Sequence, residues 1–134
     1  MDAQDGVYAQ ALAEVRAGRK RTHWMWFVFP QLDGLGTSPT ARYFGLSGLD
    51  EAIAYLAHPV LGRRLVEITA ALLELPQADP QGVFGYPDDL KLRSCLTLFA
   101  QVPGADPVFA RALDRCFAGK PDVWTLRMLG RSAA

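Results

Sequence analysis

The apolar residues of this chain recur with the spacing of short helices, and glycine or proline interrupts the pattern after each one. Between Leu61 and Leu75, apolar residues at helical spacing form one stripe, which Pro76 ends. The 12 glycines and 9 prolines are spread along the whole sequence, so each helix must be short. Strand signals are poor, because β-branched residues are few and no alternating run is bounded by hairpin turns. The pattern therefore predicts an all-α fold.

Further stripes and helix start signals predict the remaining elements. Tyr8, Leu12 and Val15 share one helical face, and similar stripes lie at residues 92–99 and 109–117. Residues that favour the first positions of a helix occur at three more places, which are Thr37–Ser38–Pro39, Ser47–Glu51 and Asp122.

Length and composition fit one globular domain. The chain has 134 residues, of which 50% are hydrophobic and 21% are charged, and fourteen basic side chains balance fourteen acidic ones. We therefore expect a compact single domain over residues 1–134, with about six or seven short helices joined by brief loops. The balanced charge gives no strong nucleic-acid signal, and no apolar run is long enough to span a membrane. The oligomeric state is not indicated.

Cysteine and histidine usage indicates a reduced protein without a metal. Cys95 and Cys116 lie in apolar segments of helical pattern, so we expect buried free thiols. No CxxC, HxxxH or HxxE spacing occurs, so neither a metal site nor a cofactor is expected. The first ten residues lack the basic and apolar regions of a secretory signal, which favours a cytoplasmic location.

Residues 18–31, with the sequence GRKRTHWMWFVFPQ, combine a basic run with closely spaced aromatic residues. Lys20 and His23 lie beside Trp24 and Trp26, and the amide of Gln31 follows. Buried indole and imidazole groups need hydrogen-bond partners, so such a cluster is typical of the border of a polar pocket. The alternative is that the aromatic residues are core and that His23 lies at its edge.

Residues 33–45 place a glycine-rich turn before a predicted helix start. Backbone amides at such a place suit an anion, although glycines that simply turn the chain explain the pattern as well. The candidate ligand-binding residues of this segment are Gly36, Ser38, Arg42 and Tyr43.

Residues 85–99 place four polar side chains at the start of a predicted helix. Asp88 and Asp89 are expected to cap this helix, and Lys91 and Ser94 lie on one of its faces. A cap and an ion pair are the simpler interpretation, but a Lys–Ser pair can also activate a hydroxyl nucleophile.

These three segments together resemble the bacterial domain of unknown function numbered 1810, of which some members carry the label calpastatin. The resemblance covers nearly the whole chain through residues 18–46, 49–65 and 83–100, with weaker similarity over 117–129. It implies a multihelical fold and transfers no activity. It supports a site built from His23, Trp24, Trp26, Gln31, Lys91 and Ser94. An inhibitor of the calpastatin kind is not expected, because such inhibitors are long and disordered.

The expected function is a small-molecule pocket for an anionic nucleotide or ADP-ribose-like ligand. Tryptophan faces would stack a base, and Lys20, Lys91 or amides near Gly36 would bind phosphate. If the ligand is turned over, we expect hydrolysis of a glycosidic or phosphoester bond. Asp88 or Asp89 would then act as the base and His23 as the acid or orienting group.

The alternative function is a non-enzymatic protein- or peptide-interaction module that docks through the aromatic stretch 23–29. The ligand hypothesis predicts that His23 and the tryptophans beside it face the segment from Asp88 to Ser94 across a shared polar cleft. The interaction hypothesis predicts exposed tryptophans and no deep pocket.

Overall fold

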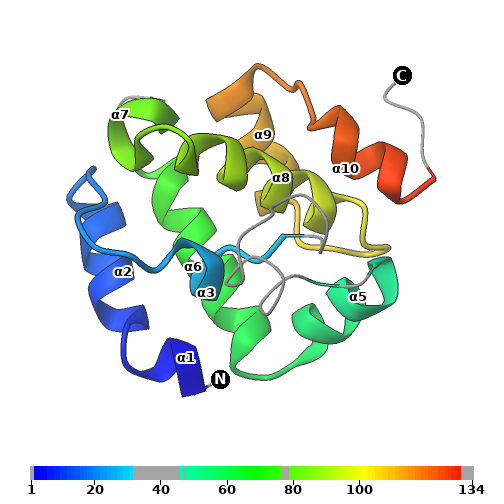
Figure 1. The fold of residues 1–134 in the computed structure, drawn as a ribbon, viewed down its shortest axis with the longest axis horizontal. Coiled ribbons are helices and arrows are strands. Elements are labelled where there is room, and N and C mark those ends of the chain that lie inside the picture. Colours follow the sequence, from blue (N-terminus) through cyan, green and yellow to red (C-terminus); the bar gives the residue numbers. More distant parts are fainter. Residues whose placement is uncertain (1, 32–45, 47, 77–78, 131–134) are drawn as a thin grey trace.

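The structure, a computed structural model, describes residues 2–31, 46, 48–76 and 79–130 (Figure 1). The helices of five or more residues are α2 (Tyr8–Arg16), α5 (Leu49–Ala57), α6 (Leu61–Leu73), α7 (Pro80–Phe84), α8 (Asp88–Ala100), α9 (Val108–Phe117) and α10 (Val123–Met128). Two four-residue segments are also helical, α1 (Asp2–Asp5) and α3 (Met25–Val28). No strand lies within the described ranges, so the predicted all-α fold is confirmed. No helix in these ranges has both the length and the apolar character to cross a bilayer.

Helix α8 is central to the core. α7, α9 and α10 contact α8, α6 contacts α9, and α2 lies along α6 on the opposite side of the molecule from α10 (Figure 1). The Phe99 ring of α8 lies 5.7 Å from that of Phe109 in α9 and 5.6 Å from that of Tyr55 in α5. One aromatic ring therefore joins three helices. The residues of α8 with no exposed surface are Leu92, Cys95, Leu96, Thr97, Leu98 and Phe99.

The first turn of α6 requires a glycine, because it passes close to the end of α5. A Cβ atom at Gly62 would lie 2.1 Å from the carbonyl oxygen of Leu56, well inside van der Waals contact. His58 Nδ1 accepts hydrogen bonds from the backbone N–H groups of Val60 and Leu61, at 3.1 and 3.2 Å. The imidazole thus satisfies amides at the start of α6, and His58 has a structural role.

The structure confirms most of the predicted helices and corrects one prediction. The apolar stripes fall in α2, α6, α8 and α9, and Asp122 caps α10 by accepting the Thr125 N–H at 3.1 Å. The predicted cap at Asp88 and Asp89 is wrong, because Pro87 occupies the N-cap position of α8 and no side-chain capping bond forms. Within the aromatic stretch 23–29, only the four residues of α3 are helical. The start predicted at Thr37–Ser38–Pro39 lies outside the described residues.

Candidate functional site

Three charged residues from separate parts of the sequence meet at the start of α8, and we term them the lysine junction. Lys20 Nζ lies 3.0 Å from Asp88 Oδ2, and Lys91 Nζ lies 3.0 Å from Asp88 Oδ1. The Lys20 side chain is only 8% exposed, so this ammonium group is largely removed from water. Burial raises the pKa of Asp88, but the hydrogen bonds from Lys20 and Lys91 outweigh burial and hold the pKa below its usual value.

Backbone and aromatic contacts fix Lys20 in this position. Its N–H donates to the Val83 carbonyl oxygen at 2.7 Å, which ties the segment after α2 to α7. Its Nζ lies 5.2 Å from the centroid of the Trp24 ring, within the range of a cation–π contact. Gly85 has a φ of 77°, a conformation that favours glycine, and turns the chain from α7 into α8. The turn places Asp88 opposite Lys20.

Glu14 of α2 holds the basic segment through four hydrogen bonds. Its Oε1 accepts the backbone N–H groups of Arg21 and Thr22 at 2.6 and 3.0 Å and the Trp24 indole N–H at 2.9 Å. Its Oε2 accepts the Thr22 hydroxyl at 2.8 Å. Burial raises the pKa of Glu14, but these hydrogen bonds outweigh burial and lower the pKa to about 2. One ionised carboxylate therefore fixes the course of residues 21–24.

Trp24 is a core residue rather than a ligand platform. Its side chain is 1% exposed, and its ring lies 6.2 Å from those of Phe29 and Phe84. Its indole N–H is bound to Glu14, so the partner predicted in the segment from Asp88 to Ser94 is wrong. The ring cannot stack a ligand base in this conformation, and it supports Lys20 instead.

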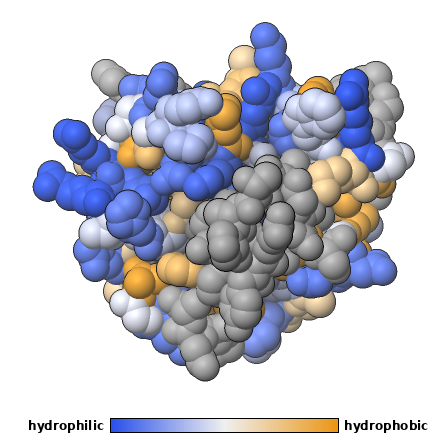
Figure 2. Space-filling model, in the orientation of Figure 1, coloured by the Kyte–Doolittle hydropathy of each residue, from blue (hydrophilic) through white to orange (hydrophobic). Residues whose placement is uncertain are grey.

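An open recess of about 480 Å³ is lined by Arg19, Lys20 and Arg21. This volume is within the range of small-molecule sites, about 300–1,000 Å³. Arg19 and Arg21 are exposed, and neither has an acidic ion-pair partner among the described residues. Figure 2 shows hydrophilic side chains projecting from the left edge of the molecule, where Figure 1 places the segment after α2. The recess is therefore basic.

Within the described residues, the hydrogen bonds of Ser94 lead away from the lysine junction, and His23 is exposed to solvent. His23 is exposed, so the expectation that this imidazole is buried and needs a partner is wrong. Ser94 Oγ lies 3.1 Å from the Leu90 carbonyl oxygen and 3.1 Å from Asp122 Oδ2. The serine hydroxyl is thus bound toward α10, which does not favour its activation by Lys91.

Two predicted site residues contain a buried polar atom without a hydrogen-bond partner in the described part of the chain. These atoms are Gln31 Nε2 and Asp89 Oδ1. The Gln31 side chain is buried, and the backbone carbonyl oxygen of Gln31 accepts the Leu46 N–H at 2.7 Å. Leaving such a buried group unpaired costs about 1–3 kcal/mol. Both atoms are therefore candidates for contact with a ligand.

The remaining predicted ligand-binding residues are described only in part or not at all. Trp26 lies in α3. Four others lie outside the described residues, namely Gly36, Ser38, Arg42 and Tyr43.

Both cysteines are free thiols, as predicted. Burial raises the pKa of Cys95 and of Cys116, so neither thiol is a ready nucleophile at neutral pH. In the part of the chain that the structure describes, no three His, Cys, Asp or Glu side chains are grouped as metal ligands.

Glu14, which orders residues 21–24, is not among the residues predicted from the sequence. Glu14 adjoins Val15 of the apolar stripe and is spaced three residues from the buried Ala11. A carboxylate on the apolar face of a helix needs hydrogen-bond donors, and this was the available signal.

Comparisons with known proteins agree with the fold and name no activity. The model of a family described as "Protein of unknown function (DUF1810)" matches residues 1–129. A similar solved structure is that of the conserved hypothetical protein Rv1873 from Mycobacterium tuberculosis, which is 48% identical. The match covers 97% of this chain and 93% of that chain, with a TM-score of 0.93. A search of the curated proteins found no match.

Proposed function

The chain belongs to the DUF1810 family of proteins of unknown function, and for this member we propose that residues 19–21 bind the phosphate of a small anionic ligand. A nucleotide or ADP-ribose-like molecule is the ligand class that we favour. The reason is that a phosphate group is the part of such a ligand that the basic recess suits best.

The observation that carries this proposal is the basic recess itself. Arg19, Lys20 and Arg21 line it, and the guanidinium groups of Arg19 and Arg21 have no carboxylate partner among the described residues. Guanidinium groups match phosphate oxygens with two parallel hydrogen bonds, so the unpaired arginines supply both charge and geometry.

The fixed backbone of this segment supports the proposal. Glu14 holds the N–H groups of Arg21 and Thr22, and Val83 holds that of Lys20. A segment that is already ordered loses little conformational freedom when a ligand binds, which favours affinity. The hydrogen bonds of Glu14 thus order the binding segment without touching the ligand.

Binding is better supported than turnover. A general base works best when its pKa is near the operating pH, and the lysines hold the pKa of Asp88 below its usual value. Asp88 is therefore a weak base. Hydrolysis of a glycosidic or phosphoester bond would have to use another group, such as Asp89, whose Oδ1 has no partner among the described residues.

The interaction module based on residues 23–29 has less support. Trp24, Met25, Val28 and Phe29 of this stretch are each at most 3% exposed, so they offer little surface to a partner protein. His23, which is exposed, and Phe27, which is half-buried, do not form a contiguous apolar patch by themselves. We also propose a cytoplasmic location, because two free thiols suit a reducing compartment.

Isothermal titration calorimetry with inorganic pyrophosphate tests the proposal. The variants Arg19→Ala and Arg21→Ala should each bind about tenfold more weakly than the wild type, because each removes a charge-assisted hydrogen bond. Arg111→Ala on α9 is a matched control, since Arg111 is also exposed but lies outside the recess. Wild-type protein that does not bind pyrophosphate, or equal affinity in all three variants, would exclude phosphate binding at residues 19–21.

A further inference from the structure

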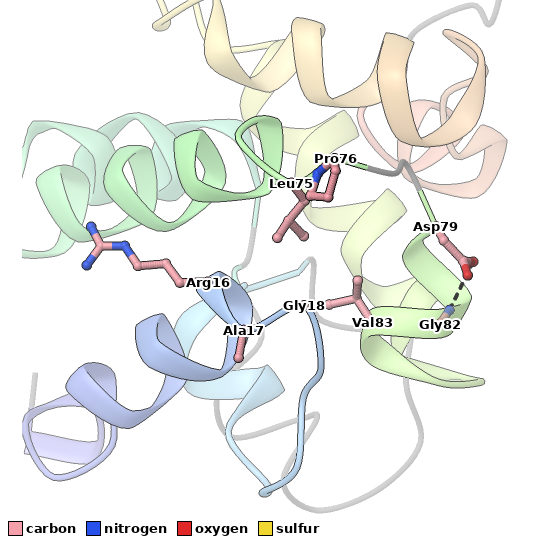
Figure 3. Close-up of a pocket in the computed structure, with 8 residues that line it drawn as sticks. All are labelled: Arg16, Ala17, Gly18, Leu75, Pro76, Asp79, Gly82 and Val83. Atoms are coloured by element: carbon pink, nitrogen blue, oxygen red, sulfur yellow. Dashed lines mark hydrogen bonds between the residues drawn. The ribbon is translucent and has the colours of Figure 1, made fainter.

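We infer that the ligand of the basic recess carries a compact apolar group, which binds in the adjoining pocket between the ends of α2 and α6 and helix α7 (Figure 3). This inference rests on the proposed function and names the ligand class more closely, as an organic phosphate with a ring-sized apolar body.

The pocket has apolar walls contributed by three elements. Its volume is about 330 Å³, and its lining includes Ala17 and Gly18 after α2, Leu75 and Pro76 after α6, and Val83 of α7. Figure 3 shows the Leu75 and Val83 side chains pointing toward the space beside Gly18. A cavity of about 150 Å³ can hold benzene, so this pocket is large enough for a single or fused ring.

Consecutive residues of the chain line the pocket and the basic recess. Residues 16–18 line the pocket, and residues 19–21 line the recess. The hydrogen bond from the Lys20 N–H to the Val83 carbonyl oxygen, at 2.7 Å, also joins a wall of the recess to a wall of the pocket. On this shared segment, one small molecule would place its phosphate in the recess and its apolar group in the pocket.

The charged residues that line the pocket favour a ligand whose phosphate lies in the recess. Arg16 lines the pocket and is exposed, and Figure 3 shows its guanidinium group directed away from Gly18. Asp79, the acidic residue of the lining, accepts the Gly82 N–H at 3.0 Å as the N-cap of α7, and Figure 3 shows its carboxylate turned to that amide. The anionic end of a ligand is thus favoured at Arg19 in the recess rather than at Asp79 in the pocket.

The test compares inorganic phosphate with phenyl phosphate by isothermal titration calorimetry. Both probes carry the phosphate, but only phenyl phosphate carries an apolar ring. Burial of the ring should make phenyl phosphate bind about tenfold more tightly to the wild type. Leu75→Ala removes one wall of the apolar pocket and should abolish the tenfold gain for phenyl phosphate. The affinity of this variant for inorganic phosphate should stay unchanged.

Leu73→Ala is the matched control, because Leu73 is a half-buried leucine at the same end of α6 that does not line the pocket. This variant should keep the tenfold gain. If Leu75→Ala does not fold, the filling variant Val83→Ile replaces it and should likewise reduce the gain for phenyl phosphate alone.

The outcomes separate the two proposals. If inorganic phosphate does not bind to the wild type, the proposed function fails and the inference fails with it. If both probes bind with equal affinity, or if the gain survives in Leu75→Ala and Val83→Ile, phosphate binding stands and the apolar pocket has no part in it. Loss of the gain in Leu75→Ala but not in Leu73→Ala supports the inference.

Discussion

Two aspartates at helix α8 are held in contrasting ways: Asp88 begins the helix, and Asp122 contacts it through Ser94 and Thr97. At the lysine junction, Asp88 is held by the ammonium groups of Lys20 and Lys91. Asp122, before α10, is held by neutral groups, since its Oδ2 accepts the Ser94 hydroxyl and both the N–H and the hydroxyl of Thr125. We term Ser94, Thr97, Asp122 and Thr125 the hydroxyl junction, because the Asp122 N–H also donates to Thr97 Oγ1 at 2.9 Å.

The contrast separates a structural junction from the proposed phosphate site. In the hydroxyl junction, neutral donors form hydrogen bonds to the Asp122 carboxylate. The other three residues of this junction, Ser94, Thr97 and Thr125, are buried. It is therefore complete without a ligand. The lysine junction adjoins a recess whose exposed arginines have no acidic partner in the described part of the chain. The positive charges of these arginines are therefore available to an anion.

The largest expected effect is the loss of stability in Asp122→Ala. The substitution removes the cap of α10 and leaves the buried hydroxyls of Ser94 and Thr125 with one acceptor fewer. We expect the free energy of unfolding to fall by about 3 kcal/mol, with phosphate affinity unchanged. Urea unfolding measures the first quantity and calorimetry the second.

Asp114→Ala is the control for this variant, since Asp114 is exposed on α9. Its free energy of unfolding should change by no more than about 0.5 kcal/mol. A comparable loss in both variants, or weaker phosphate binding in Asp122→Ala, would remove the distinction between the two junctions.

At the lysine junction we expect Asp88→Asn to strengthen phosphate binding. The substitution removes the negative charge that competes for Lys20, while the amide oxygen can still accept a hydrogen bond. Phosphate affinity should rise about fivefold, and the free energy of unfolding should fall by about 1–2 kcal/mol. Asp114→Asn makes the same change of net charge away from the recess, so equal gains in both variants would show a non-specific charge effect.

The last expected effect concerns the pH dependence of stability. The pKa of Glu14 is lowered in the folded protein from 4.5 to about 2, so its contribution to stability is complete above the higher value. That contribution is lost as the pH falls from about 5 toward 2. Glu14→Gln should therefore show a shallower loss of stability in this range than the wild type, as measured by urea unfolding at several pH values. Parallel curves would contradict the assignment.

The helical framework and the Asp122 cap of the hydroxyl junction were predictable from the sequence. The stripes of α6, α8 and α9 follow from the 3.6-residue period, and Asp122 was found as a cap because it precedes a short apolar run. Both signals are local. They depend on residues that are at most a few turns apart.

The lysine junction was only partly predictable, because its contacts are not local. Lys20 and Asp88 were each singled out, but nothing in their spacing pairs them, and Asp88 was expected to act as a cap. The burial of Trp24 against Phe29 and Phe84 likewise depends on tertiary packing. An aromatic residue beside basic residues is compatible with a core and with a ligand site, and the sequence alone does not distinguish them.

The most direct test is a titration of the isotope-labelled protein with inorganic phosphate, followed through backbone amide chemical shifts. The amides of residues 19–21 and of Asp88 should shift with a common saturation curve, because these residues surround the proposed phosphate site. The amides of Asp122 and Thr125 should not move, because the hydroxyl junction is complete without a ligand. Absence of saturable shifts at residues 19–21, or equal shifts at both junctions, would contradict the account.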